Sequence, residues 1–170
     1  MPRRGRRAPA TSAQLQFAFQ PARPAPAWLS PRVRVALVHD PEPVTPVSLR
    51  GSADIYAFLK DEVATWDRER FLTLMLDNRH YLIAVEEVSV GSLSASIVHP
   101  REVFKAIILA NAAAFVVAHN HPSGDPSPSK EDIEITQRLR SIAELIGVRF
   151  LDHIVVGRGR YVSFVDDGYW

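Results

Sequence analysis

Hydrophobic residues recur with helical spacing in three stretches of the chain that follow residue 50. Each stretch carries a local helix signal. Ser52 is suited to an N-cap, Pro100 to a first turn and Gly147 to a C-terminal cap. The pattern therefore predicts helices over residues 53–66, 100–111 and 129–147.

Short apolar runs between the predicted helices are typical of buried strands. Two such runs occupy residues 71–76 and 114–118, and the polar tetrapeptide 77–80 predicts a hairpin turn into a returning strand at 81–90. Further strands are predicted at 94–99, at 148–151 and 154–156 (two strands or one interrupted strand), and at 161–165. Because strands and helices alternate, we expect an α/β fold, a sandwich with a mixed β-sheet flanked by helices.

The first 45 residues differ in composition from the rest, which predicts a Pro/Arg-rich, largely disordered leader over 1–45 and a folded domain over 46–170. Nine of the thirteen prolines fall within residues 1–46, and proline lacks an amide donor and fixes its own backbone angle. Apolar and polar residues alternate at 14–20 and 32–39. The first of these segments is predicted as a short strand or a partner-binding segment, and the second as a strand leading into the domain.

Charge is distributed unevenly, with a net +6 over residues 1–50 and a net −5 over residues 51–170. Two interpretations stay open for a cluster of arginines in the leader: a nucleic-acid contact or a solvated tail. The cluster consists of Arg3, Arg4, Arg6 and Arg7.

The chain contains no cysteine, which excludes disulfides and leaves His, Asp and Glu as possible metal ligands. No apolar run approaches the ~20 residues needed to span a membrane. The arginine-containing start is not followed by an apolar segment, so we expect no secretory signal, no membrane partner and a cytoplasmic location.

Candidate chemistry concentrates at His119, His121 and Asp132. Residues i and i+2 of a strand face the same side, so both imidazoles can aim at one point while Asn120 points away and can bond neighbouring backbone. Two imidazoles and one carboxylate leave the fourth position of a tetrahedral zinc open for water, as in a catalytic site. The alternative for the acid is a capping box, since Ser129 and Asp132 also form a Ser-x-x-acid pattern at a helix start.

These residues resemble the signature of JAMM (JAB1/MPN) metalloproteases: His119-x-His121, seven residues, Ser129, two residues, Asp132. The longer string HNHPSGDP that begins at His119 is similar to the RadC branch of that family. Further similarities to that branch are Pro128-Ser129, Gly91-Ser92-Leu93, Pro100-Arg101-Glu102 and Leu151-Asp152-His153-Ile154. The resemblance covers roughly residues 46–170 and implies a JAMM-type α/β fold related in layout to cytidine deaminases.

By that resemblance, His119, His121 and Asp132 ligate Zn²⁺ and Ser129 steadies an oxyanion. The family also uses a Glu from another segment as general base. Glu69 is our choice, because it precedes the predicted strand 71–76 as the family's Glu precedes its first strand. The rival candidates, from the following strand, are Glu86 and Glu87.

The pair Asp152-His153 is a second group with two open interpretations. Either the pair supports the metal site as a hydrogen-bond partner of a ligand, or it satisfies backbone groups at the end of a strand.

Together, the site and the resemblance predict a zinc metallopeptidase of JAMM type that cleaves a peptide or isopeptide bond in a protein or peptide substrate. The alternative is a DNA-associated protein acting in DNA repair or mobile-element biology, with the basic leader as anchor and the metal fold as binding platform. Against this alternative, the predicted domain is net acidic and has no basic-aromatic stripe. A nucleoside deaminase is disfavoured because its P-C-x-x-C motif requires cysteine.

Overall fold

The computed structural model describes residues 16–18, 34–36, 45–91 and 98–170. The chain divides into two compact units, Met1–Thr45 and Pro46–Trp170. In the first unit, β1 (Gln16–Ala18) pairs antiparallel with β2 (Arg34–Ala36). The arginine cluster of the leader lies outside the described residues, as does most of the strand predicted at 94–99.

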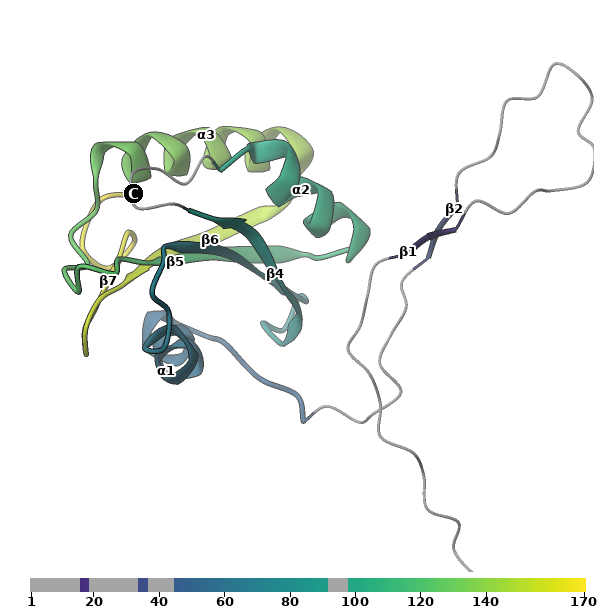
Figure 1. Ribbon diagram of the computed structural model, residues 1–170. Helices are drawn as coiled ribbons and strands as arrows, with labels where there is room; N and C mark the ends of the chain where they lie inside the picture. Colours follow the sequence, from purple (N-terminus) through teal and green to yellow (C-terminus); the bar gives the residue numbers. More distant parts are fainter. Residues whose placement is uncertain (1–15, 19–33, 37–44, 92–97) are drawn as a thin grey trace, which may run out of the picture. The chain divides into compact units, whose positions relative to one another are not determined.

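The second unit is a five-stranded sheet with helices on both faces (Figure 1). The elements are α1 (Ser52–Val63), β3 (Arg70–Leu76), β4 (Leu82–Val90), α2 (Pro100–Leu109), β5 (Ala114–Asn120), α3 (Lys130–Ile146), β6 (Arg149–Val156) and β7 (Tyr161–Ser163). The strand order in the sheet is β4-β3-β5-β6-β7. The β5–β6 pair is parallel and the other pairs are antiparallel, so the sheet is mixed. The predicted α/β sandwich with a mixed sheet is confirmed.

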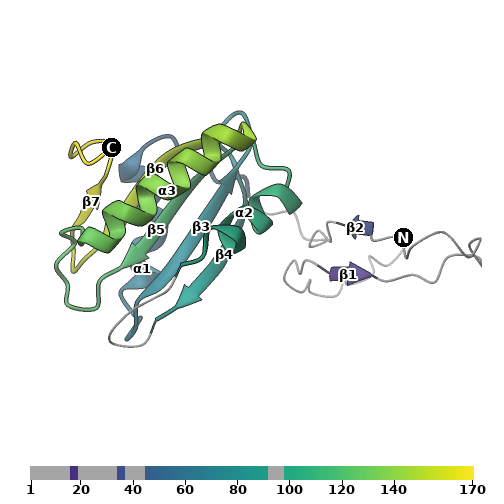
Figure 2. The same ribbon diagram turned by 90° about the horizontal axis from the view of Figure 1, so that it is seen from above.

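Each face of the sheet has its own apolar core, with α1 on one face and α2 and α3 on the other (Figure 1). In the view from above, α3 and α2 lie over the strands (Figure 2). Side chains alternate along a strand, so β3 and β5 contribute to both cores and read as continuous apolar runs. The core on the α1 face includes Ile55, Leu59, Leu72, Leu74, Val116 and Ala118. The core beneath α2 and α3 includes Phe71, Met75, Phe104, Phe115, Val117 and Leu139.

Both caps of α3 match the predicted residues, whereas the N-cap of α1 differs from the predicted one. Ser129 is the N-cap of α3, and Gly147 ends the helix in the left-handed conformation that favours glycine, at φ 74°. The predicted cap Ser52 is wrong. Gly51 is the N-cap of α1, and the Ser52 hydroxyl donates instead to Asp166. The 148–151 and 154–156 segments form one strand, β6. No helix in the described parts of the chain is long and apolar enough to cross a membrane.

Asp152 ties β6 to the turn that follows β7. Its carboxylate accepts hydrogen bonds from the amides of His153 (2.7 Å) and Val165 (3.1 Å) and from the Ser163 hydroxyl (2.6 Å). Burial raises the pKa of Asp152 above its ordinary value, although these three bonds act in the opposite direction. The carboxylate is therefore a structural acceptor whose ionisation opposes folding.

We predict that Asp152→Asn lowers the free energy of unfolding near neutral pH by about 1–3 kcal/mol, because the Ser163 hydroxyl loses its acceptor. The folded-state pKa of Asp152 is raised, so the wild type gains stability as pH falls through that pKa toward the unfolded value. Asn cannot titrate, and the stability difference between the two proteins should therefore widen on acidification. Urea unfolding at several pH values between about 4 and 7 measures it.

Asp167→Asn is the matched control, because Asp167 is exposed and accepts from the amide of Ser163 in the same turn. Its effect at neutral pH should stay below about 1 kcal/mol. An Asp152→Asn difference that stays constant or shrinks on acidification contradicts the assignment.

Candidate metal centre

His119 and His121 stand at the end of the central strand β5. His119 is buried (1% exposed) on the face covered by α2 and α3, where its ring stacks against Phe71 with 5.9 Å between centroids. His121 lies one residue beyond the strand, and its amide donates to the carbonyl of Val156 in β6 (2.9 Å). The sheet therefore holds the backbone on which both imidazoles are mounted.

Asn120, between the two histidines, faces the other side of the sheet. Its Nδ2 donates to the carbonyl of Arg68 (2.9 Å), and its Oδ1 accepts from the amide of Arg70 (2.8 Å). The prediction that Asn120 bonds neighbouring backbone is confirmed. These two bonds fix the chain on both sides of Glu69, so one side chain couples the metal-site strand to the segment that carries the predicted base.

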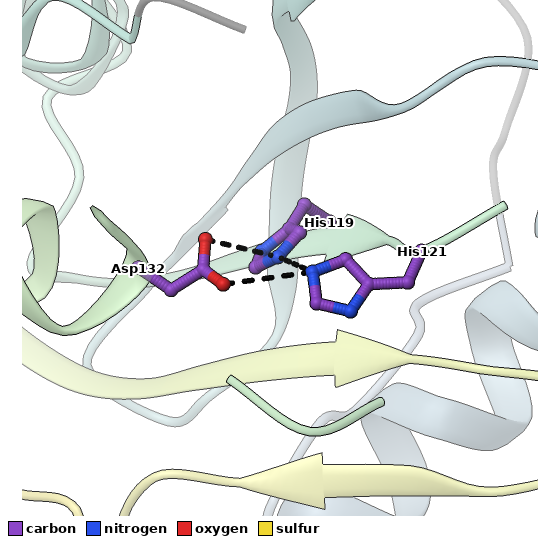
Figure 3. A group of neighbouring side chains, drawn as sticks. All are labelled: His119, His121 and Asp132. Atoms are coloured by element: carbon purple, nitrogen blue, oxygen red, sulfur yellow. Dashed lines mark hydrogen bonds and ion pairs between the residues drawn. The ribbon is translucent and has the colours of Figure 1, made fainter. Parts of the chain in front are cut away.

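The three predicted ligands converge in space (Figure 3). Nε2 of His119 lies 3.0 Å from Nε2 of His121 and 3.2 Å from Oδ1 of Asp132. Nε2 of His121 lies 3.5 Å from Oδ2 of Asp132. Within the described ranges this is the one group of three or more His, Asp or Glu side chains placed to hold a metal ion.

The donor set fits a first-row metal such as zinc, for which imidazole nitrogen and carboxylate oxygen are ordinary ligands. Nδ1 of His121 lies 2.7 Å from the carbonyl oxygen of Asp125. A carbonyl only accepts, so Nδ1 carries a proton and Nε2 is the ring nitrogen that faces the centre and could ligate a metal. The loop after β5 thus prepares His121 for metal ligation.

The charges of the site are arranged for a cation. Burial alone would raise the pKa of Asp132, but hydrogen bonds from His119 and His121 hold it well below its ordinary range. The hydrogen bond to Asp132 also raises the pKa of His121, against an opposing effect of burial. An ionised carboxylate beside two imidazoles matches what a divalent cation requires.

Asp132 serves the helix and the site together. The amide of Ser129 donates to its Oδ2 (2.7 Å), and its own amide donates to the Ser129 hydroxyl (3.1 Å), which completes a capping box. Both interpretations of Asp132 therefore describe the same side chain. The Ser129 hydroxyl donates to Oδ2 of Asp132 (2.6 Å), so the predicted oxyanion donor lies in direct contact with a ligand.

The three candidate bases differ in their relation to the site. Glu69 directly precedes β3 and is half-buried, and its negative charge contributes to the raised pKa of His121. Glu86 lies opposite Thr73 in β4. Glu87 is exposed and pairs with Arg70 (2.9 Å). Of these three glutamates, only Glu69 contributes to the raised pKa of His121.

The pair Asp152-His153 divides between two roles. His153 is fully buried, and its Nε2 lies 2.8 Å from Nδ1 of His119. Asp152 instead serves the turn after β7. The structure also brings Thr136 to His153 (2.6 Å), a contact that sequence reasoning missed. Its one signal in the sequence is that Thr136 lies one helical turn after Asp132, on the same face of α3.

A cavity of about 320 Å³ opens beside His121. The end of α1 and the turn between β6 and β7 form its walls, and neither segment was predicted to belong to the site. Its lining includes Tyr56, Lys60, Trp66, Asn120, His121, Gly157 and Arg158. The metal cluster therefore borders a space large enough for part of a substrate.

Comparison with known proteins places these features in a family. A family model described as "RadC-like JAB domain" matches residues 49–169. A UPF0758 protein of Methanosarcina acetivorans is 50% identical over 116 residues, covering 68% of this chain and 51% of the relative. A UPF0758 protein of Syntrophotalea carbinolica is 42% identical over 168 residues, covering 94% of this chain and 65% of the relative. The chain thus spans about half to two thirds of the length of these relatives.

We predict that the wild-type chain binds one zinc ion and that His119→Ala, His121→Ala and Asp132→Asn each weaken binding by more than about 100-fold. Loss of a merely supporting group typically costs 10–100-fold, and loss of a ligand should exceed that. Competition with a chromophoric chelator measures the affinity. His99→Ala is the control, because His99 is exposed and makes no side-chain cap bond at α2. Tight stoichiometric binding by any of the three variants refutes that residue as a ligand.

Proposed function

The chain belongs to the RadC-like JAB domain family, and from this membership and the geometry of the site we propose that it is a zinc-dependent hydrolase. The bond cleaved is a peptide or isopeptide bond in a protein or peptide substrate. The observation that carries the proposal is the convergence of His119, His121 and Asp132, with their ligand atoms within 4.8 Å of one another. Two imidazoles and one carboxylate leave a coordination position for water, as catalytic zinc sites do.

A zinc ion held by these side chains supplies a water of pKa about 7 and a Lewis acid for the substrate carbonyl. Glu69 accepts a proton from the attacking water and returns it to the leaving amine. The hydrogen bonds of Asn120 to Arg68 and Arg70 support this role, because they fix the backbone around Glu69 relative to the histidines. A base that is held in place needs no reorganisation during the reaction.

The Ser129 hydroxyl donates a hydrogen bond to the oxyanion that develops on the substrate carbonyl. In the structure this proton points to Oδ2 of Asp132 (2.6 Å). Rotation about the Cβ–Oγ bond of Ser129 would turn this proton away from Asp132 and toward a bound substrate. The substrate group on one side of the scissile bond enters the cavity beside His121, where Trp66 and Tyr56 offer aromatic walls.

We predict that Glu69→Gln retains zinc but loses about 10²–10⁴-fold in turnover, because the amide cannot take the proton. The assay incubates the zinc-loaded chain with a peptide library and with lysine isopeptide conjugates, and mass spectrometry detects the cleavage.

Glu86→Gln and Glu87→Gln are matched controls that remove the same charge from β4. Both should retain wild-type turnover. Full activity in Glu69→Gln together with its loss in one of the controls transfers the role of base to that control residue.

The role of the Ser129 hydroxyl is separable from its capping role. Ser129→Gly preserves the helix start at a cost of only a few tenths of a kcal/mol, because glycine is tolerated at an N-cap. Removal of an oxyanion donor should nevertheless lower kcat by about 10²–10³-fold. Comparing kcat with the unfolding free energy of both proteins tests this, and unchanged kcat in Ser129→Gly excludes the hydroxyl from catalysis.

A further inference from the structure

A chain of hydrogen bonds runs behind His119, away from the cavity. We propose that Thr136 and His153 form a neutral relay that holds His119 in the tautomer whose Nε2 is free to ligate metal. This inference rests on the proposed metal centre, and both residues act by positioning His119, without contact to substrate.

The direction of the relay is set at its first bond. Oγ1 of Thr136 donates to the main-chain carbonyl of Asp132 (2.6 Å), one turn earlier in α3. A hydroxyl has one proton, so toward Nδ1 of His153 (2.6 Å) the same oxygen can only accept. Nδ1 of His153 must therefore carry a proton.

His153 has a single proton to place. The residue is 0% exposed. Among the described residues, the hydrogen-bond partners of its imidazole ring are Thr136 and His119, and neither side chain carries a formal negative charge. A buried imidazole without such a partner is neutral, because a buried charge without compensation is costly. With the proton on Nδ1, the Nε2 of His153 is an acceptor.

The acceptor lies 2.8 Å from Nδ1 of His119, so that nitrogen carries the proton of the His119 ring. The other nitrogen, Nε2, faces the centre 3.2 Å from Oδ1 of Asp132, and it is the nitrogen that would ligate a bound metal. With the opposite tautomer, an N–H would occupy the direction of the metal. The relay begins at the main-chain carbonyl of Asp132 and ends beside its carboxylate, so it links two ligands through uncharged groups.

The rings are held so that the relay cannot easily reorient. His153 stacks on Phe164 with 4.6 Å between centroids and 20° between planes, and it meets the edge of Phe71 at 5.6 Å. Phe71 also stacks on His119. These aromatic contacts fix both imidazole planes, which a tautomer-selecting hydrogen bond requires.

Thr136→Val is the decisive variant, because it keeps the β-branched shape and removes the acceptor for His153. Zinc affinity of the full chain should fall by about 10–100-fold, the usual effect of losing an outer partner of a metal ligand. Thr136→Ser restores the hydroxyl and should restore the affinity. Ser141→Ala is the control on the same helix, because the Ser141 hydroxyl makes the same i−4 bond to Gln137 (3.0 Å) at an exposed position. It should bind zinc as the wild type does.

Long-range proton–nitrogen NMR of the histidine rings reads the tautomers directly in the zinc-loaded wild-type chain. His119 and His153 should both carry the proton on Nδ1, and Thr136→Val should shift the proton of His153 toward Nε2. A purely structural role would lower the unfolding free energy without changing the tautomer signals.

A wild-type spectrum with the proton on Nε2 of either ring overturns the proposal, whether or not the Val variant folds. Unchanged zinc affinity in a folded Thr136→Val also overturns it. Wild-type tautomers as expected, with zinc bound but no hydrolysis of any substrate, would uphold the relay and refute the proposed hydrolase. The two failures are therefore distinguishable.

Discussion

The central position of β5 is the constraint on which the site depends. The strand pairs with β3 on one side and with β6 on the other, and its side chains enter both cores. Because side chains alternate along a strand, the last residues of β5 face opposite sides of the sheet and have different tasks. His119 faces the metal centre, while Asn120 binds the backbone around Glu69 on the other face. A shift of the register by one residue would exchange these tasks and abolish both.

Asp132 adds the second constraint, because one carboxylate both caps a helix and completes the candidate metal centre. A helix N-terminus stabilises negative charge through its free amides, and the capping box directs Oδ2 to the amide of Ser129. The other oxygen is left to face His119. The helix start thus holds the carboxylate in one orientation, so that local backbone chemistry sets the geometry of the site.

Local signals explain what could be predicted from the sequence. The apolar runs of β3 and β5, the caps of α3 and the spacing of His119 and His121 depend on neighbours within a few residues, and each appears in the structure. The Ser52 cap failed because the preceding Gly51 takes the extended conformation at φ −162° and becomes the cap itself. The Ser52 hydroxyl donates instead to Asp166, a partner far along the chain that spacing within one segment does not reveal.

The residues behind and beside the ligands could not be predicted, because the pairing of distant segments brings them there. His153 reaches His119 only through the parallel register of β5 and β6, which contains an irregularity between Phe115 and Val116. The cavity likewise depends on α1 and the turn after β6 meeting at the end of β5. Neither arrangement follows from spacing within one segment.

An uncharged partner behind His119 has an electrostatic consequence. A carboxylate in the place of His153 would orient the imidazole equally well, but it would put a second negative charge in a fully buried position. The proposed relay would satisfy every polar atom with neutral donors and acceptors, so that Asp132 would be the one anionic ligand. Two neutral imidazoles and one carboxylate would leave a bound divalent cation with a net positive charge. In the proposed hydrolysis, that surplus would favour the negative oxygen that develops on a substrate carbonyl.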